Sequence, residues 1–502
     1  MTEQPSVSEL RRAALSGARW TAGERLAAEL AAFASAIVLA RLIPPAEFGR
    51  AAVALIVVAL ATVLGTAGVT APVVQRRTLA REQLAGAAFL GLALGAAGTA
   101  ATAAVALAVA PAVFGDRTAE LVLLASPAWL LVGLGGTSQA LLQRALRFRR
   151  QAAIEATAVL AGIGASLGGA LAGLDGEAIV LGALALPGTV ALLSVASAPP
   201  PPPVPGRRAT LELWREAAPV AGSSLVYLGY RNVDYAILGA QAGAAQVGFY
   251  WRAYQLGVAY QSKISRVLLR VSFPIYSRAT SLADLRAIRM RIVRAHATVL
   301  VPLLATFVGV APVLVPWVFG DTWEPTVVPA QIMALAGMCD AVVTGVGPLL
   351  VAVGRARTLL RWNLAVLAAY AALVGALAPF GITAVAVGVA SFGLAVVVGV
   401  QLLLLRPTVG LTLRDLWGDV RAGVLAGAAV LVVVAAARRA LEPLDLADPV
   451  VLAVLGAVAA ATYVAVLRLA FADAWRDLTA VVRRAPAPPP ATRSGDAPYP
   501  NG

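Results

Sequence analysis

An arginine and an aspartate lie three residues apart inside a mostly apolar part of this sequence. The segment GYRNVDYAILG (residues 229–239) carries Tyr230, Arg231 and Asp234, which share one face if the segment is helical. Two interpretations of this face are compatible. Arg231 and Asp234 can neutralise each other and fix the rotation of the helix, or the three side chains can line a polar cavity and contact a ligand.

A second polar stripe follows on the next apolar segment. Positions on one helix face recur at steps of three and four residues over about 27 Å of helix: Arg252, Gln255, Ala259, Lys263, Arg266 and Arg270, of which all but Ala259 are polar or charged. One guanidinium group can bind two phosphate oxygens at once through parallel N–H donors, so the stripe predicts an anionic ligand. Basic residues also mark the cytoplasmic ends of membrane helices, which explains the end of the stripe but not Arg252. We expect Arg252 and Arg231 to face one cavity at similar depth.

Three more ionisable residues lie in apolar runs. Arg25 and Glu29 are four residues apart in the first run and can form an ion pair on one helix face. Asp340 lies mid-run, and the sequence places no arginine or lysine within one helical turn of it. Such an acid can carry a coupling proton or Na⁺, or can stay neutral and hydrogen-bonded. The ion-coupling candidates are therefore Asp340, Asp234 and Glu29.

Enzymatic chemistry is not predicted. A phosphate-binding loop needs Gly-Lys-Ser/Thr, but the sole lysine, Lys263, follows Ser262. A metal site needs clustered ligands, whereas the chain has one cysteine, Cys339, and one distant histidine, His296. We expect no catalytic residue, no metal and no cofactor.

The composition indicates which solvent surrounds these residues. Hydrophobic residues make up 60% of the 502 residues and charged residues 13%, with a mean hydropathy of +0.81. Soluble chains are about one quarter charged. About 20 apolar residues span a bilayer as a helix, and fourteen runs fit: 17–41, 51–74, 84–110, 119–143, 152–172, 177–197, 214–239, 246–271, 293–319, 326–353, 359–378, 382–405, 419–437 and 449–470. We predict an all-α polytopic membrane protein with about 14 transmembrane helices.

The arginines predict the orientation. With a cytoplasmic N-terminus, the inside segments hold 29 arginines and the outside segments five, as the positive-inside rule requires. Both termini should therefore face the cytoplasm, and no cleavable signal peptide is expected. The net charge of +14 is spread loop by loop on one side, so it predicts contact with anionic lipids rather than with nucleic acid.

Three similarities in the same order predict an internal duplication. APAVFGD at 110–116 matches VPWVFGD at 315–321, ALAGLDGEAIV from 170 matches ALAPFGITAVA from 376, and the sequence around Gly49 matches that around Gly248. Each unit is six helices, so the two lobes should be related by a pseudo-two-fold axis along the membrane normal. The predicted division is a cytoplasmic N-terminus (1–16), an N-lobe (17–197), a Pro-rich linker (198–212), a C-lobe (213–405), two further helices (406–472) and a Pro-rich cytoplasmic tail (473–502).

Five segments together resemble one known family. They are ARLIPPAEFGRAAVAL (40–55), QALLQRALRFRRQA (139–152), VGFYWRAYQL (247–256), FPIYSRA (273–279) and VFGDTW (318–323). The combination resembles the polysaccharide-transporter branch of the multidrug/oligosaccharidyl-lipid/polysaccharide (MOP) exporter superfamily, which contains the Wzx-type flippases of lipid-linked oligosaccharides. The resemblance implies two six-helix lobes around a V-shaped cavity that opens to one side at a time.

The resemblance also implies a function. A Wzx-type flippase moves a polyprenyl-pyrophosphate oligosaccharide from the inner to the outer leaflet of the bacterial cytoplasmic membrane for surface polysaccharide, beside a polymerase and glycosyltransferases. Basic residues on the first helix line the cavity in related lipid flippases. The substrate-binding candidates are Arg25, Arg231, Arg252, Lys263, Arg266, Tyr230 and Gln255.

Two alternatives stay open. A cation-coupled drug exporter of the same superfamily would favour buried acids over a basic stripe. A membrane-embedded assembly factor for polysaccharide would carry out no transport of its own.

Overall fold

The structure is a computed structural model, and it describes residues 28–76, 79–205, 207–259 and 281–483. These residues form helices joined by short turns, and no strand occurs among them. The prediction of an all-α fold is confirmed. Three of the candidate substrate contacts, Arg25, Lys263 and Arg266, lie outside the described residues.

The first lobe begins with the helix of residues 28–42. It continues through α2 (Pro45–Gly65), the π-helical turn η1 (Thr66–Thr70), α3 (Ala71–Gln75), α4 (Arg81–Ala108), α5 (Ala110–Phe114), α6 (Asp116–Ala125), α7 (Ala128–Arg144), α8 (Phe148–Leu171) and α9 (Gly176–Ser197).

The second lobe begins with α10 (Arg207–Gln241), α11 (Ala244–Tyr254) and the π-helical turn η2 (Gln255–Ala259). It continues with α13 (Leu282–Phe319), η3 (Asp321–Thr326), α14 (Val327–Val343), α15 (Val346–Ala352), α16 (Ala356–Leu377), η4 (Ala378–Phe380), α17 (Ile382–Gly399), η5 (Val400–Leu405) and α18 (Arg406–Val409). Beyond it lie α19 (Leu413–Leu441), η6 (Glu442–Leu444), α20 (Asp448–Ala470) and α21 (Ala472–Arg483).

Eleven helical stretches among the described residues are long and apolar enough to cross a membrane. Each matches one of the fourteen expected spans. The three remaining expected spans, 17–41, 214–239 and 246–271, carry charged residues or run into segments that the structure does not describe. The total of fourteen therefore stays a prediction. Helices suit this environment because each satisfies its backbone hydrogen bonds within itself.

Small residues let the helices pack closely, as is usual in membrane proteins. A Cβ on Gly91 of α4 would lie 2.6 Å from the carbonyl oxygen of Gly133 in α7. In the same way, a Cβ on Gly423 of α19 would lie 2.2 Å from the carbonyl oxygen of Ala297 in α13. Glycine at these positions allows backbone contact between helices far apart in the sequence.

The predicted repeat has equivalent turns in the two lobes. Gly115 and Gly320 both precede a helix that begins with aspartate, and both have left-handed φ angles, +81° and +99°, with ψ at 159°. The repeated motif ALAGLDGEAIV/ALAPFGITAVA also matches, because α9 begins at Gly176 and α17 at Ile382, which correspond in the alignment of these two segments. These turns agree with a duplicated chain.

Two predicted boundaries differ from the structure. Helix α10 begins at Arg207, inside the predicted linker of residues 198–212, and α21 occupies the start of the predicted tail. Both segments, TLELWREA and DAWRDLTAVV, contain many residues that favour helix. The Pro-rich composition beside each segment concealed that tendency.

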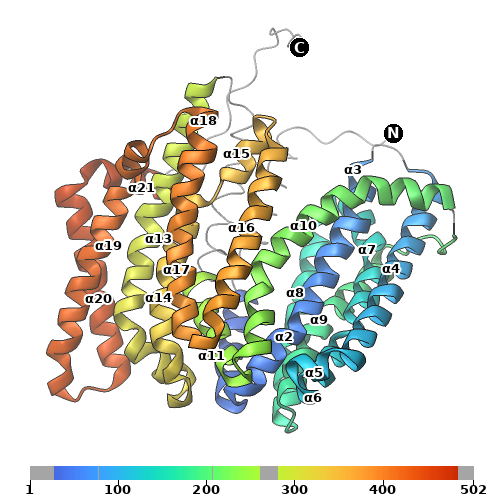
Figure 1. The fold of residues 1–502 in the computed structure, drawn as a ribbon, viewed down its shortest axis with the longest axis horizontal. Helices are drawn as coiled ribbons and strands as arrows, with labels where there is room; N and C mark the ends of the chain where they lie inside the picture. Colours follow the sequence, from blue (N-terminus) through green and yellow to red (C-terminus); the bar gives the residue numbers. More distant parts are fainter. Residues whose placement is uncertain (1–27, 77–78, 206, 260–280, 484–502) are drawn as a thin grey trace.

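Figure 1 shows the two lobes side by side, with α19 and α20 beyond the second lobe. Helices α3, α15, α18 and α21 lie towards one end of the bundle, and α5 and α6 lie at the other. Where the structure describes them, the arginine-rich loops expected in the cytoplasm adjoin the first end. We call the end with α5 and α6 the outer end, following the prediction from the arginines.

Candidate functional site

A cavity of about 180 Å³ lies within the second lobe, lined by α10, α11 with η2, α14, α16 and α17. Its polar and charged lining includes three residues that the sequence singled out, Tyr230, Arg231 and Asp340. The polar residues that the structure adds include Tyr254, Asn363 and Tyr370. The cavity therefore presents a cation, a carboxylate, an amide and phenol groups within a largely apolar lobe, which is the mixture that binds a polar or charged ligand.

The guanidinium of Arg231 lies 5.4 Å from the centre of the Tyr254 ring, a cation–π distance. Tyr230, the preceding residue, packs against the ring of Tyr370 with centroids 5.1 Å apart. These contacts orient Arg231 toward α11 and Tyr230 toward α16. The sequence pointed to Tyr230 and Arg231, but nothing in it identified the aromatic partners on other helices.

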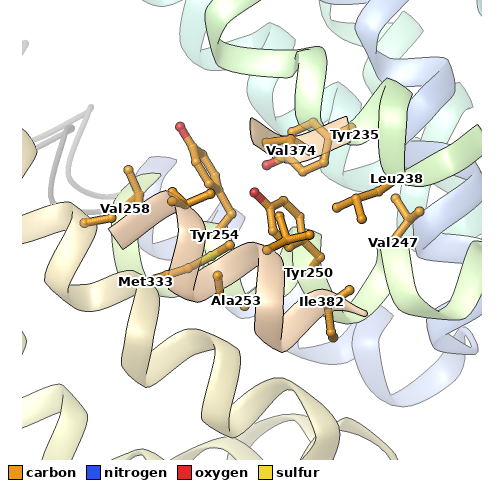
Figure 2. Packing of buried hydrophobic residues seen from close by; sticks show 14 of the residues in the cluster. Tyr235, Leu238, Val247, Tyr250, Ala253, Tyr254, Val258, Met333, Val374 and Ile382 are labelled. Carbon is orange, nitrogen blue, oxygen red and sulfur yellow. The ribbon is translucent and has the colours of Figure 1, made fainter. Parts of the chain in front are cut away.

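Asp234 lies beside this cavity in a different setting. Its carboxylate is 1% exposed and accepts hydrogen bonds from the hydroxyls of Tyr250, at 2.8 Å, and Tyr370, at 3.0 Å. Its other oxygen accepts from the backbone N–H of Tyr235 at 3.0 Å. Figure 2 shows Tyr235, Tyr250 and Tyr254 in one cluster of buried apolar side chains.

The expected ion pair between Arg231 and Asp234 is wrong. No salt bridge joins these two residues, both of which the structure describes. Three positions along a helix leave the two side chains only about 60° apart, but their partners differ, since Asp234 is directed toward Tyr250 and Tyr370 and Arg231 toward Tyr254. Asp234 thus joins α10 to α11 and α16 through hydrogen bonds.

Asp340 lies in the last turn of α14, where the membrane-spanning helix is interrupted. The hydroxyl of Thr344 donates to the carbonyl oxygen of Asp340 at 2.8 Å. Gly345 then adopts a left-handed φ of +89° before α15 begins. Interrupted helices of this kind are common at the binding sites of transporters.

Arg289 of α13 caps this interruption. Arg289 is only 3% exposed, and its guanidinium donates hydrogen bonds to the carbonyl oxygens of Val342 and Thr344, both at 2.6 Å. The cation faces the C-terminal end of α14, where the helix dipole is negative. Sequence reasoning counted Arg289 only as a cytoplasmic arginine. The expected span began at residue 293, so the sequence placed Arg289 before the helix, whereas α13 begins at Leu282.

Arg252 does not line the cavity, contrary to expectation. Its side chain is 1% exposed and lies among the rings of Phe48, Trp251, Phe319 and Trp323. The turn between α10 and α11 gives it a depth similar to that of Arg231, but its helix face is directed toward the first lobe. The two arginines therefore do not share a cavity in this conformation.

The remaining candidates are dispersed. Gln255 is half-buried at the start of the π-helical turn η2, and Glu29 is exposed on the helix of residues 28–42. His296 is buried, with its Nδ1 2.8 Å from the carbonyl oxygen of Ile292. The structure thus brings together Tyr230, Arg231 and Asp340, and it separates these from Arg252 and Glu29.

Comparison with known proteins identifies relatives of this chain. The profile of a family described as polysaccharide biosynthesis protein matches residues 38–328, more than half of the chain. The lipopolysaccharide biosynthesis protein WzxC of Escherichia coli strain K12 is 26% identical over 372 residues, which cover 70% of this chain and 73% of WzxC. The teichuronic acid biosynthesis protein TuaB of Bacillus subtilis strain 168 is 30% identical over 140 residues, 28% of this chain and 29% of TuaB.

The fold also has a solved counterpart. The lipid II flippase MurJ in an inward closed conformation matches with a TM-score of 0.67 and 13% identity, covering 90% of this chain and 100% of that chain. At this identity the likeness concerns the fold.

The helices, their apolar composition and these relatives define a multi-pass protein of the bacterial cytoplasmic membrane whose fold is similar to that of MurJ. The chain belongs to the polysaccharide biosynthesis protein family. The resemblance to the Wzx-type branch is confirmed.

Proposed function

We propose that this protein is a flippase that moves a lipid-linked oligosaccharide, carried on a polyprenyl pyrophosphate, from the inner to the outer leaflet for surface polysaccharide synthesis. The observation that carries the proposal is the similarity to WzxC over 70% of the chain. A polymerase and glycosyltransferases would act on the same lipid-linked oligosaccharide, before and after its translocation.

The transport mechanism would be alternating access. Two lobes with equivalent turns can rock against each other around a site between them. In this conformation they meet through α2 and α11, which pack together near the outer end, and through α10, which packs on α2, η1 and α4 of the first lobe. The outer side would therefore be closed here, and the cargo would enter from the cytoplasmic side.

Arg231 and Tyr230 would contact the cargo from the second lobe. Arg231 offers paired N–H donors to phosphate oxygens, and Tyr230 offers a ring face and a hydroxyl to a sugar. Lys263 and Arg266 would extend this basic surface, as the spacing of the stripe predicts, and Arg25 would extend it from the first helix, as the resemblance to related lipid flippases implies.

Ion coupling would involve Asp340. Its carboxylate lines the same cavity as the oppositely charged Arg231, so binding of a proton or Na⁺ at Asp340 would weaken any attraction between them. Asp234 is less suited to this role, because its carboxylate is held by two tyrosine hydroxyls and a backbone amide. Glu29 is exposed in the described conformation.

Reconstituted transport tests the proposal. Purified protein in liposomes would be supplied with a polyprenyl-pyrophosphate-linked N-acetylglucosamine oligosaccharide, and its arrival in the opposite leaflet would be measured with an impermeant lectin. We expect translocation above protein-free liposomes and a large loss in Arg231→Ala. The matched control is Arg357→Ala, at an exposed arginine that does not line the cavity. Equal translocation with and without protein would overturn the proposal.

A cation-coupled drug exporter is the second candidate, and one observation favours it. Asp340 and Asp234 place two carboxylates in or beside a cavity inside one lobe. Transport of a cationic dye by the same liposomes, without translocation of the lipid-linked oligosaccharide, would support the exporter. Absence of both activities would favour an assembly factor.

A further inference from the structure

Arg252 is surrounded by four aromatic rings that come from both lobes. The guanidinium carbon lies 4.6 Å from the ring centre of Phe319, 4.8 Å from Trp323, 5.0 Å from Phe48 and 5.3 Å from Trp251. Trp251, Phe319 and Trp323 belong to the second lobe, as Arg252 does. Phe48 belongs to α2 of the first lobe. The second lobe therefore supplies the cation and three of the aromatic rings, and the first lobe supplies the fourth ring.

Hydrogen bonds between the lobes surround this cluster. The indole Nε1 of Trp323 donates to the carbonyl oxygen of Ala40 at 2.8 Å. Arg41 of the first lobe donates to the carbonyl oxygens of Val318, at 3.0 Å, and Trp317, at 2.5 Å, at the end of α13. Since Trp323 is fully buried, its indole needs such a partner in the closed arrangement.

The backbones of α2 and α11 touch one turn away. A Cβ on Gly49 would lie 1.8 Å from the carbonyl oxygen of Ala244, and a Cβ on Gly248 would lie 1.9 Å from that of Pro45. Gly49 and Gly248 are the pair that the predicted repeat aligns. The two lobes thus meet at their equivalent glycines, beside the four aromatic side chains around Arg252.

We propose that Arg252, Phe48, Trp251, Phe319 and Trp323 form a lock that holds the outer ends of the two lobes together. Arg252 is a positioning residue in this lock, because it acts through the lobes and not on the cargo. The charge of Arg252 is stabilised by the ring faces while the lobes are closed. When the lobes part, water would replace Phe48 beside the guanidinium group. The inference rests on the proposed alternating-access function and deepens it.

Arginine suits this position better than other residues of its size. Its planar guanidinium stacks on several rings at once and is more weakly hydrated than an ammonium group. A cation–π contact is worth more when water is excluded, which the 1% exposure of Arg252 indicates. The lock is therefore strong when closed, and it opens without leaving an apolar surface at its centre.

The reactivity of a cysteine behind the lock measures opening. Ala52 of α2 is 3% exposed and packs in a cluster whose other buried members all belong to the second lobe, so separation of the lobes would uncover it. Ala52→Cys would be introduced with Cys339→Ala, and its rate of reaction with a water-soluble thiol reagent would be followed in purified protein in nanodiscs. This rate reports the open fraction even when that fraction is small, and it needs no substrate.

Three variants probe the lock in this background. We expect Phe48→Leu and Arg252→Met to raise the reaction rate about 2- to 30-fold, the range that one cation–π contact spans. Arg252→Lys should stay closer to the parent, because the ammonium retains a cation over the rings. Phe380→Leu, at an exposed phenylalanine outside the lock, is the control and should leave the rate unchanged.

A second reporter separates opening of the lock from loss of folding. Ala158→Cys, buried within α8 of the first lobe, should react at the same rate in the parent and in all lock variants. An unchanged rate at Ala52→Cys in folded Phe48→Leu and Arg252→Met would overturn the lock, and so would an equal rise at both reporters. A raised rate at the first reporter alone would support the lock even if reconstituted liposomes showed no translocation of lipid-linked oligosaccharide, in which case only the proposed cargo would fall.

Discussion

Replacing Gly49 with alanine should force the outer ends of α2 and α11 apart. The added Cβ would lie 1.8 Å from the carbonyl oxygen of Ala244 and 2.8 Å from the backbone nitrogen of Gly248. Carbon and oxygen atoms in close contact normally stay about 3.3–3.6 Å apart. Since both obstacles are backbone atoms, no side chain can rotate away, and the helices would have to separate by roughly 1.5–1.8 Å.

The cost of this separation falls on the closed arrangement. Adding a methyl group to a tightly packed contact costs about 1–3 kcal/mol, which corresponds to a change of about 5- to 150-fold in an equilibrium. A conformation with parted lobes lacks this contact and would bear little of the cost. Gly49→Ala should therefore shift the protein toward opening at the outer end, and Gly248→Ala should do the same through the carbonyl of Pro45.

The assay is the thiol reactivity of Ala52→Cys in the Cys339→Ala background, together with thermal unfolding. We expect faster reaction for Gly49→Ala and for Gly248→Ala, and a double variant that gains less than the product of the two, because both changes act on one contact. Gly375→Ala in α16 is the matched control, since its Cβ would meet nothing within 4 Å and alanine favours a helix by about 1 kcal/mol. A folded Gly49→Ala protein that reacts at the parent rate would refute the reasoning.

Three other substitutions test the second lobe. Asp234→Ala should destabilise the protein by about 1–3 kcal/mol in thermal or denaturant unfolding, because it leaves two buried tyrosine hydroxyls without their acceptor, and adding Arg231→Ala should not restore the loss. Arg289→Ala should lower stability by a similar amount, about 1–3 kcal/mol, with partial recovery in Arg289→Lys; equal stability of Arg289→Ala and the parent would remove the capping role. Asp340→Asn should change the dependence of translocation on pH or Na⁺ more than the affinity for the cargo, and identical ion profiles for variant and parent would contradict the coupling role.

The sequence by itself determined the class of protein and its helical organisation. Long apolar runs specify membrane helices wherever they occur, because an unpaired backbone group is costly in lipid whatever the neighbours are. The turns at Gly115 and Gly320 were recognisable for a similar reason, since a left-handed φ angle is a local requirement that glycine meets without strain. The chain order of these features was enough to indicate a repeat.

The tertiary structure alone decided what each charged residue does. Arg231, Asp234 and Arg252 all fit the helical spacing of a polar face, but spacing does not identify the facing helix. Asp234 binds Tyr370, which is 136 residues away, and Arg252 is surrounded by rings from α2 and from the turn after α13. A buried charge is stabilised by whichever hydrogen-bond donors or ring faces the fold brings next to it. Those partners come from distant parts of the chain. The sequence therefore showed that these residues are costly to bury, and only the packing of the two lobes showed what compensates each of them.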